Sequence, residues 1–237
     1  MESVECESSC RYVVGVSWPR SGHHLAVNLL QEYFGDEFSY CEFYTPKDCC
    51  RTAPCIRHGS VKFSKNHDFF SMMPISDRHP YLIQYRSFLP SVVSAFEMFV
   101  GQGRPDTLAS FEEFAIAAAD MYNAFLAKWV FGLHPPGERL ILRYEELTSD
   151  SNMDFISSLI RFFAPSHPVE FGRIRRIRAS IQKEFVERGR KGVIDGFGVK
   201  ATRDVEEFRF YDRRLFRKLG ALTCKSEEKS LRALGER

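Results

Sequence analysis

Residues 13–25 read Val13-Val-Gly-Val-Ser-Trp-Pro-Arg20-Ser-Gly22-His-His-Leu25. A short β-branched run is followed by a tight loop, and an apolar helical periodicity begins at Leu25. A strand, a loop and a helix in this order form an anion site, because the loop N–H groups and the helix N-terminus face the loop mouth. Gly22 lets a ligand approach the backbone, and Arg20 adds a charged donor. We therefore expect the loop to bind a phosphate-like group.

Two other interpretations of this loop compete with an anion site. Pro, Ser and Gly are common in ordinary turns for purely local reasons, so the segment alone is compatible with a turn of no special function. The Walker A pattern GxxxxGK[ST] is absent, so the loop is not that of an ordinary nucleotide triphosphatase. The rest of the chain has to decide between a turn and a binding loop.

The chain length and composition are those of one α/β domain. Its 237 residues suffice for a substantial core, and 44% hydrophobic with 27% charged residues is ordinary globular usage. Strands that alternate with helices predict a central parallel β-sheet flanked by helices. We expect a single domain over residues 1–237, with 1–10 and 225–237 as flexible tails. Strands are predicted at 12–17, 60–64, 80–85 and 138–143, and helices at 24–34, 91–100, 111–131, 152–163, 170–188 and 204–219.

Charge and hydropathy exclude some partners. A net charge of +2 gives no general case for nucleic acid, although eight Lys or Arg residues gather between positions 173 and 191. The N-terminus is acidic where a signal peptide would be basic, and no apolar run approaches the roughly 18 residues of a membrane span. We expect a cytoplasmic protein without a membrane span, and the sequence leaves its oligomeric state open.

Five motifs together resemble one enzyme family. The segment Trp18–Leu25 is similar to YPKSGTTW of the sulfotransferases that use 3′-phosphoadenosine-5′-phosphosulfate (PAPS) as sulfuryl donor. Four further signatures of that family have counterparts in the same order along the chain: Lys65-Asn-His67-Asp68, Arg86 followed eight residues later by Ser94, Tyr144-Glu-Glu146, and Arg190-Lys191-Gly192. Each match is weak by itself, but five in sequence order are specific.

The resemblance implies a fold, a reaction and a set of site residues. It implies a P-loop-like strand–loop–helix site for phosphosulfate and transfer of the sulfuryl group to a hydroxyl, or an amine, of an acceptor, with no metal required. His67 would be the general base, and Arg20 or Lys65 would stabilise the leaving phosphate. Arg86 and Ser94 would share the 3′-phosphate. The nucleotide contacts that it implies are Pro19, Arg20, Ser21, Gly22, His23, His24, Arg86, Ser94, Tyr144, Arg190, Lys191 and Gly192.

The sequence departs from the family pattern at several of these positions. Arg20 replaces a usual Lys, and His23 and His24 replace two Thr residues. Pro90 lies four residues after Arg86 instead of two. An Arg in the loop is common in carbohydrate and bacterial members, which favours a glycan or a small hydroxylated metabolite as acceptor. The acceptor pocket is expected from residues 36–59, 68–79 and 101–110.

Alternatives remain for the base and for the activity. A lone His after a strand is more often structural, and Asp68 could simply pair with His67. His23, His24 or an acidic residue could serve as the base instead. A nucleotide-dependent kinase or NTPase would need a Walker Lys and a pair of Mg²⁺ ligands, which are not evident. A catalytically inactive protein that binds a bisphosphate nucleotide stays open.

Four of the seven cysteines lie close together in the sequence, at Cys41, Cys49, Cys50 and Cys55, with His58 nearby. No CxxC pair is present, and the spacing matches no standard zinc finger. A reducing compartment disfavours disulfides. We expect reduced thiols that pack near the acceptor site, with metal or disulfide chemistry as the less favoured alternative.

Overall fold

The protein is described from a computed structural model that covers residues 10–44, 50–132, 139–149, 153–190 and 204–235. Five parallel strands form one sheet in the order β2-β3-β1-β4-β5. The strands are β1 (Val13–Ser17), β2 (Tyr40–Glu42), β3 (Phe63–Asn66), β4 (Tyr81–Tyr85) and β5 (Arg139–Arg143). The predicted α/β domain with a central parallel sheet is confirmed.

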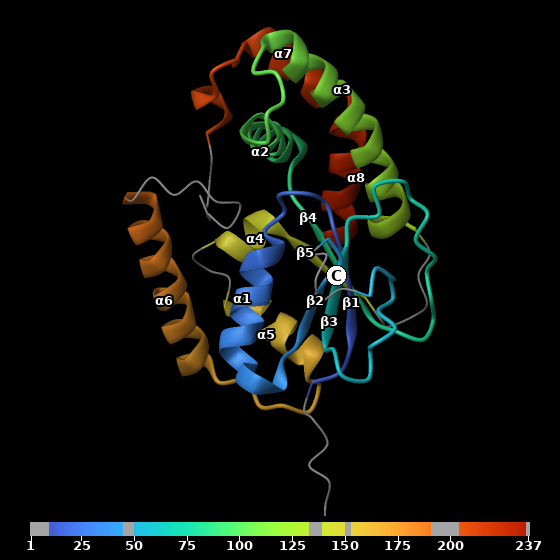
Figure 1. Cartoon of the computed structure of the whole chain (residues 1–237), viewed down its shortest axis with the longest axis vertical. Coiled ribbons are helices and arrows are strands. Elements are labelled where there is room, and N and C mark those ends of the chain that lie inside the picture. Colours follow the sequence, from blue (N-terminus) through green and yellow to red (C-terminus); the bar gives the residue numbers. More distant parts are fainter. Residues whose placement is uncertain (1–9, 45–49, 133–138, 150–152, 191–203, 236–237) are drawn as a thin grey trace, which may run out of the picture.

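Helices cover both faces of the sheet (Figure 1). On one face α1 (His23–Phe34), α5 (Met153–Phe163) and α6 (Phe171–Arg190) pack on Val13, Phe63, Leu82 and Leu142. The other face presents Val14, Val16, Ile83 and Ile141 to α2 (Phe88–Gly101), α3 (Leu108–Phe125) and α7 (Arg213–Ala221). Successive strand residues point to opposite faces, so the inner strands β1 and β4 are buried on both sides.

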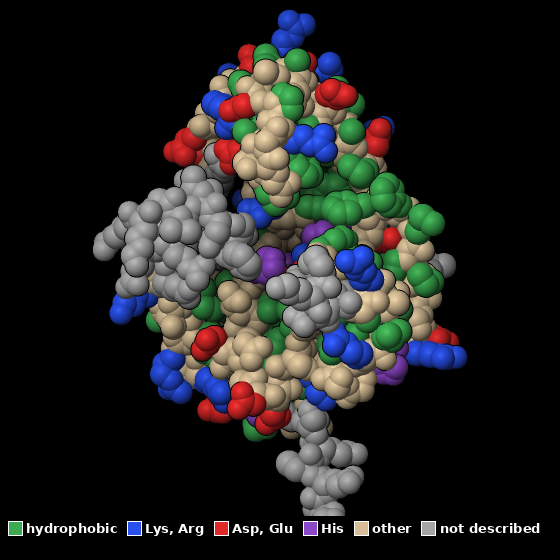
Figure 2. Space-filling model, viewed as in Figure 1, with side chains coloured by type: hydrophobic (Ala, Val, Ile, Leu, Met, Phe, Trp, Pro, Cys, Tyr) green, Lys and Arg blue, Asp and Glu red, His purple; other side chains and the backbone are tan. Residues whose placement is uncertain are grey.

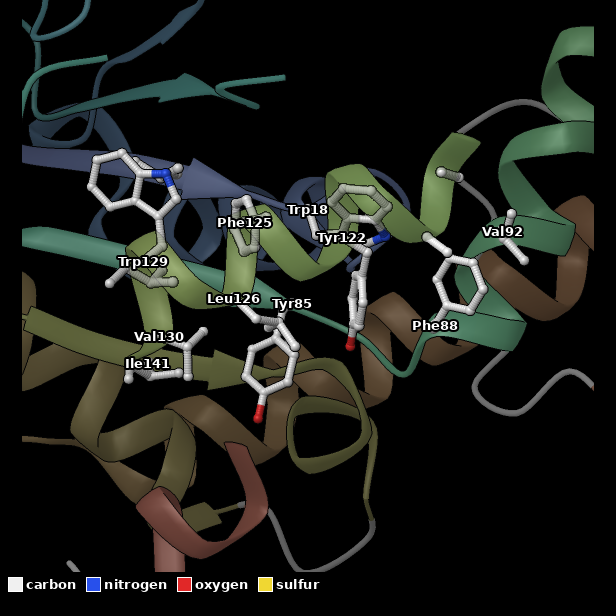
Figure 3. Close-up of a cluster of buried hydrophobic side chains, with 14 of the residues drawn as sticks. Trp18, Tyr85, Phe88, Val92, Tyr122, Phe125, Leu126, Trp129, Val130 and Ile141 are labelled. Atoms are coloured by element: carbon white, nitrogen blue, oxygen red, sulfur yellow. The ribbon is translucent and has the colours of Figure 1, made fainter. Parts of the chain in front are cut away.

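The aromatic stripe of residues 111–131 belongs to the core, as the sequence predicts. Tyr122 and Trp129 are fully buried, and Figure 3 shows them with Trp18, Tyr85 and Phe88 beneath the sheet edge. The rings of Trp18 and Tyr122 meet edge-on with their centroids 5.1 Å apart. The first residue of the anion loop is therefore anchored in the core.

The structure differs from the predicted elements at a few positions. The edge strand β2 was not predicted, because three residues are too few to show a period. The predicted helix 111–131 consists of α3 and a π-helical turn at Leu126–Val130 (η2). The predicted helix 204–219 divides into the short turn Val205–Glu207 (η3) and α7, because the Asp212 side chain caps α7 by accepting a hydrogen bond from Leu215 N. Two shorter segments, Gly35–Glu37 (η1) and Tyr144–Thr148 (α4), complete this part of the chain.

The expectation of a flexible tail from residue 225 needs correction over the described residues. Cys224–Gly235 forms helix α8. The Glu227 carboxylate accepts hydrogen bonds from Phe88 N at 2.6 Å and from the Tyr122 hydroxyl at 3.2 Å. This charged segment is thus held in the fold by the Glu227 carboxylate, which accepts a hydrogen bond from an N–H group at the start of α2 that has no partner within the helix. Among the helices that the structure describes, none combines the length and the apolar character that a bilayer crossing requires.

Candidate active site

The loop between β1 and α1 is fixed at its start by three interactions of Trp18. Its backbone N–H donates to Gln84 O at 2.8 Å, and its indole Nε1 donates to Ser91 Oγ at 3.0 Å. Its ring packs on Tyr122 and Phe125. These contacts join the loop to β4, α2 and α3, so the loop leaves the carboxyl edge of the sheet in a defined direction. Ligands of parallel α/β sheets bind at this edge.

Two residues of the loop have left-handed backbone conformations, Arg20 with φ 63° and Gly22 with φ 78°. A Cβ atom on Gly22 would lie 2.5 Å from Cδ2 of Tyr144, so no larger residue fits there. Gly22 precedes α1, whose first turn has no side-chain cap. A positive φ next to an uncapped helix N-terminus is the backbone form of an anion nest. The predicted binding loop has the required local geometry.

Two guanidinium groups lie at this loop. Arg20 donates from Nε to Ser94 Oγ at 2.9 Å, which joins the loop to α2. Arg86 follows β4, is 6% exposed and lies over the Tyr144 ring with 4.2 Å from Cζ to the centroid. Burial lowers the pKa of Arg20, and the nearby charge of Arg86 lowers it further. Two half-buried or buried cations that repel each other are stabilised by a bound anion.

The sequence places Arg86 and Ser94 on one phosphate, and the structure gives a more detailed arrangement. Ser94 lies in the second turn of α2, not the first, because the helix begins at Phe88. Its hydroxyl contacts Arg20, while Arg86 stacks on Tyr144. Tyr144 begins α4 instead of ending a strand, and its ring separates Gly22 from the Arg86 guanidinium. Contact of Tyr144 with adenine stays a prediction.

His67 follows β3 and is bound to the base of the loop. Its Nδ1 lies 2.6 Å from the carbonyl oxygen of Ser17, the last residue of β1. A carbonyl only accepts hydrogen bonds, so Nδ1 carries the ring proton and Nε2 keeps its lone pair. Burial, followed by the charge of Lys65, lowers the pKa of His67 to about 3. The imidazole is therefore neutral, with Nε2 in the state that accepts a proton.

Aromatic rings hold His67 on its outer side. The Tyr44 ring stacks on it at 5.0 Å between centroids, and the Phe69 ring lies at 5.1 Å. The backbone N–H of His67 donates to the Tyr44 hydroxyl at 2.9 Å. These contacts put parts of the predicted acceptor spans 36–59 and 68–79 beside His67. In the third predicted span, 101–110, Asp106 forms an ion pair with Arg209, which lies on the chain segment before α7.

Asp68 does not pair with His67. Its Oδ2 accepts hydrogen bonds from Lys128 Nζ at 2.6 Å and Trp129 Nε1 at 2.9 Å, and its Oδ1 accepts from Met73 N at 2.8 Å. The carboxylate thus fastens the chain after β3 to the π-helical turn. The alternative in which His67 is held by its neighbouring Asp is wrong, because the backbone of β1 takes that role.

Lys65 is the third cation of the site. It is 6% exposed, and its Nζ lies 3.3 Å from Glu42 Oε1 on the neighbouring edge strand β2. Burial lowers its pKa, and Glu42 opposes that effect. The other carboxylate oxygen of Glu42 accepts a hydrogen bond from the Tyr40 hydroxyl. Glu42 thus holds Lys65 in place, and an acidic residue as the base stays an alternative.

His23 is held within the protein at both ring nitrogens. Nε2 lies 2.7 Å from the Tyr40 hydroxyl, and Nδ1 lies 3.0 Å from Gln84 Oε1. The hydroxyl already donates to Glu42, so His23 donates from Nε2 and its Nδ1 must accept. If the oxygen and nitrogen of the Gln84 side-chain amide exchange places, the amide nitrogen donates to His23 Nδ1. This orientation also gives a partner to Gln84 Nε2, which is otherwise buried without one among the described residues. The His23 side chain therefore orders the loop, and a contact of His23 with a nucleotide stays a prediction.

Of the two loop histidines, His24 is the one with a partly exposed side chain. Burial lowers its pKa, and the charge of Lys65 lowers it further. Ser21 is buried, and its hydroxyl donates to Gln84 O at 3.4 Å. The predicted C-terminal clamp is not tested: Arg190 ends α6 without a described side chain, and Lys191 and Gly192 lie outside the described residues. Pro19 lies in the loop as expected.

Figure 2 shows the surface consequence of this arrangement. His side chains and Lys or Arg side chains meet in a hollow in the middle of the molecule, and hydrophobic side chains border it. Within the expected acceptor span 68–79, Phe70 and Met72 are 84% and 82% exposed, whereas Met73 is 7% exposed and belongs to the core. The site thus combines a cationic floor with aromatic and apolar surroundings.

Comparisons with known proteins place the fold. No family model and no curated protein match the sequence. Among solved structures, the chain is similar to the mouse sulfotransferase SULT7A1, whose crystal structure is described as complexed with PAP. The match has a TM-score of 0.63 and 15% identity, and it covers 92% of this chain and 84% of that chain. The chain has a sulfotransferase fold.

Sequence reasoning missed several residues that build this candidate site. Tyr40, Glu42 and Tyr44 lie in or next to the unpredicted strand β2, and Gln84 lies at the end of β4. The alternation of polar Tyr40 and Glu42 around Cys41 was the available signal, since it puts both polar side chains on one face of a strand. The segment is too short for that pattern to stand out.

Proposed function

We propose that this protein is a PAPS-dependent sulfotransferase that transfers a sulfuryl group to an acceptor hydroxyl, carried by a glycan or a small hydroxylated metabolite. The hydrogen bond from His67 Nδ1 to Ser17 O supports this most, because it fastens an unprotonated Nε2 to the base of the anion loop. The fold of a sulfotransferase crystallised with PAP adds independent support.

The residues present suit a bisphosphorylated nucleotide. Gly22 has a left-handed conformation and packs against the Tyr144 ring, where a Cβ would clash. A phosphate at this loop would meet the N–H groups of the uncapped N-terminus of α1. Arg20 and Arg86 repel each other in partly dry surroundings, which a polyanion relieves. We assign Arg86 and the backbone of residues 19–24 to the phosphates, with Ser94 orienting the Arg20 guanidinium. Arg190, Lys191 and Gly192 stay proposed contacts of the 3′-phosphate.

Each catalytic task can be assigned to named groups of this chain. When bound, PAPS supplies a sulfuryl group attached to its 5′-phosphate. The acceptor oxygen bonds to sulfur while the bond from sulfur to the phosphate oxygen breaks, and the hydroxyl proton goes to His67 Nε2. Arg20 and Lys65 stabilise the negative charge that grows on the leaving oxygen. Negative charge at the loop also offsets the effect of Lys65 on His67, which raises the pKa of the base in the complex.

The test combines binding with transfer. Calorimetry should show that adenosine 3′,5′-bisphosphate binds at least tenfold tighter than AMP, because a second phosphate meets a cationic site. Labelled PAPS is then offered with a panel of glycans, phenols and aliphatic alcohols. We expect transfer by the wild type, a loss of about 10²–10⁴-fold in His67→Ala, and normal transfer by the control His79→Ala.

His79 suits as a control because it is also a partly buried His with a lowered pKa, but it packs against Tyr12 and His58. Equal affinity for the two nucleotides would contradict the nucleotide site. Tight binding without transfer to any acceptor, or without consumption of PAPS, would favour the inactive nucleotide-binding protein.

A further inference from the structure

The thiol groups of three cysteines meet at one point of the structure. Cys41 is the middle residue of β2, while Cys50 and Cys55 belong to the connection between β2 and β3. Their three Sγ atoms all lie within 4.8 Å of one another. Cys41 and Cys55 are 4% and 1% exposed, and Cys50 is half-buried. The cluster therefore faces solvent on one side only, through Cys50.

The spacing of the sulfur atoms suits a thiophilic metal ion. Zinc bonds to thiolate sulfur at ~2.3 Å, which in a tetrahedron separates two sulfurs by roughly 3.8 Å. Cys50 and Cys55 already lie 3.4 Å apart, and the structure holds both as thiols. Small rotations of these side chains would bring the three sulfurs to the ligand distance. Sulfur ligands select zinc over magnesium or calcium, which prefer oxygen.

The polar groups around the sulfur atoms can donate hydrogen bonds, and metal-bound thiolates accept such bonds from neighbouring groups. The Arg57 guanidinium points Nη2 at Cys41 Sγ from 3.9 Å. The Thr52 hydroxyl lies 3.0 Å from Cys50 Sγ. Three thiolates and one zinc ion carry a net charge of −1, which the Arg57 charge offsets. Outer hydrogen-bonding partners of this kind orient the ligands of metal sites, whereas a cluster of thiols that only fills space has no use for them.

The position of the cluster gives such an ion a structural role. The strand β2 has three residues and lies at the edge of the sheet, so it is held by few ladder hydrogen bonds. The connection after it is fastened near Cys55, whose N–H donates to the Tyr12 hydroxyl at 2.7 Å. An ion bound by Cys41 and Cys55 would join the connection directly to β2. The neighbours of Cys41 are Tyr40 and Glu42, which hold His23 and Lys65.

We propose that Cys41, Cys50 and Cys55 bind one Zn²⁺ ion, with water as the fourth ligand on the solvent side of Cys50. The ion fastens the β2–β3 connection to the edge strand that carries the partner of Lys65. The site is separate from sulfuryl transfer, and its existence does not rest on the proposed function. The sequence left metal binding as the less favoured alternative because the ligand spacings, nine and five residues, correspond to no standard finger.

The experiment measures metal on the full chain. A parent variant carries Ser at positions 6, 49 and 224, so that Cys10 is the one cysteine left outside the cluster. The chain is stripped with a chelator under reducing conditions and titrated with Zn²⁺ against a colorimetric chelator. Co²⁺ is added in parallel, because thiolate ligands give it an intense near-ultraviolet charge-transfer band.

We expect one Zn²⁺ per parent chain, a thiolate band with Co²⁺, and a melting temperature that rises with Zn²⁺. Cys41→Ser and Cys55→Ser should each weaken Zn²⁺ binding by more than about tenfold and remove the thermal shift. Cys10→Ser, which changes a buried thiol of the opposite core, should bind Zn²⁺ like the parent. Far-ultraviolet circular dichroism of the metal-free variants shows whether each one folds.

Three results would overturn the proposal. The first is a parent chain that binds no Zn²⁺ at micromolar concentration. The second is binding that persists unchanged in folded Cys41→Ser and Cys55→Ser. The third is a Cys50–Cys55 disulfide, found by peptide mapping of wild-type chain alkylated at cell lysis, since a disulfide removes two of the three ligands. None of these readouts uses sulfotransferase activity, so a failure of the proposed function leaves this test unaffected.

Discussion

Gly22→Ala tests the contact between the loop that joins β1 to α1 and the Tyr144 ring, against which the Arg86 guanidinium lies. At φ 78° an Ala residue loses about 1–2 kcal/mol of stability relative to Gly. Its Cβ would also lie 2.5 Å and 2.8 Å from two carbon atoms of the Tyr144 ring. That ring is 5% exposed and lies against the Arg86 guanidinium, so it has little room to move. Overpacking of this kind costs about 1–3 kcal/mol more.

The matched control is Gly103→Ala. Gly103 also has a positive φ, 88°, but no atom lies within 4 Å of the position of its Cβ. It therefore shows the conformational cost without the steric one. Gly22→Ala should unfold about 2–12 °C below Gly103→Ala, since 1 kcal/mol corresponds to roughly 2–4 °C in a chain of this size. Differential scanning calorimetry measures the shift.

The same substitution should act on the nucleotide site. If the Tyr144 ring is displaced, Arg86 loses its support and adenosine 3′,5′-bisphosphate binds more weakly, whereas Gly103→Ala leaves this affinity unchanged. In a Tyr144→Ala background the steric penalty of Gly22→Ala should disappear, and only the conformational cost should remain. Equal melting temperatures for Gly22→Ala and Gly103→Ala would refute the packing of Tyr144 on the loop.

Four further predictions concern the cations and the base. Arg20→Ala should lower kcat more than it weakens binding of adenosine 3′,5′-bisphosphate, because its charge acts most strongly on the leaving oxygen; a rise in KM with unchanged kcat would move that role to Lys65. Glu42→Gln leaves the buried Lys65 ammonium without its carboxylate and should destabilise the fold by about 3 kcal/mol in chemical denaturation. The control Asp106→Asn, which breaks the exposed ion pair with Arg209, should destabilise it much less. With a pKa of about 3, His67 is neutral throughout the range from about pH 5 to 8. The pH profile of kcat/KM should therefore show no decrease on the acidic side near pH 6.5. A decrease near pH 6.5 that persists in His67→Ala would identify another histidine as the base. The same pKa lies below the value of 6.5 expected for an unfolded chain, so the unfolded state binds a proton first as the pH falls. The stability of the folded protein should therefore decrease below about pH 6.5. Melting temperatures of the wild type and of His67→Ala, measured across this pH range, test the decrease.

The sequence determined the framework of the site. β-Branched runs and helical periodicities located β1, β4 and β5, because a buried parallel strand needs continuous apolar residues. The PRSG loop between a strand and a helix predicted the binding edge, since local backbone preferences at Pro and Gly act within a few residues. The order of motifs around His67, Arg86 and Tyr144 predicted a sulfotransferase fold, which the comparison with solved structures confirms.

Other features depend on contacts between residues that are distant in the sequence. The charged segment at 225 becomes a helix because Glu227 meets Phe88 N, 139 residues away. The partner of His67 is a backbone carbonyl, Ser17 O, and a backbone group carries no signal of its identity in the sequence. Asp68, adjacent to His67, is turned instead toward Lys128. Neighbours along the chain therefore do not predict neighbours in the site.

The edge strand β2 shows most clearly what only the tertiary structure decides. Three residues are too few for a periodic signal, yet pairing with β3 gives them a face each: Tyr40 and Glu42 turn toward His23 and Lys65, and Cys41 turns toward Cys50 and Cys55. The sequence determined which chemical groups this chain possesses and which local elements they occupy, because those depend on short-range sterics and hydrophobic period. Which groups touch is decided by the parallel register of the sheet, because it pairs residues 23 to 67 positions apart and gives each strand two faces.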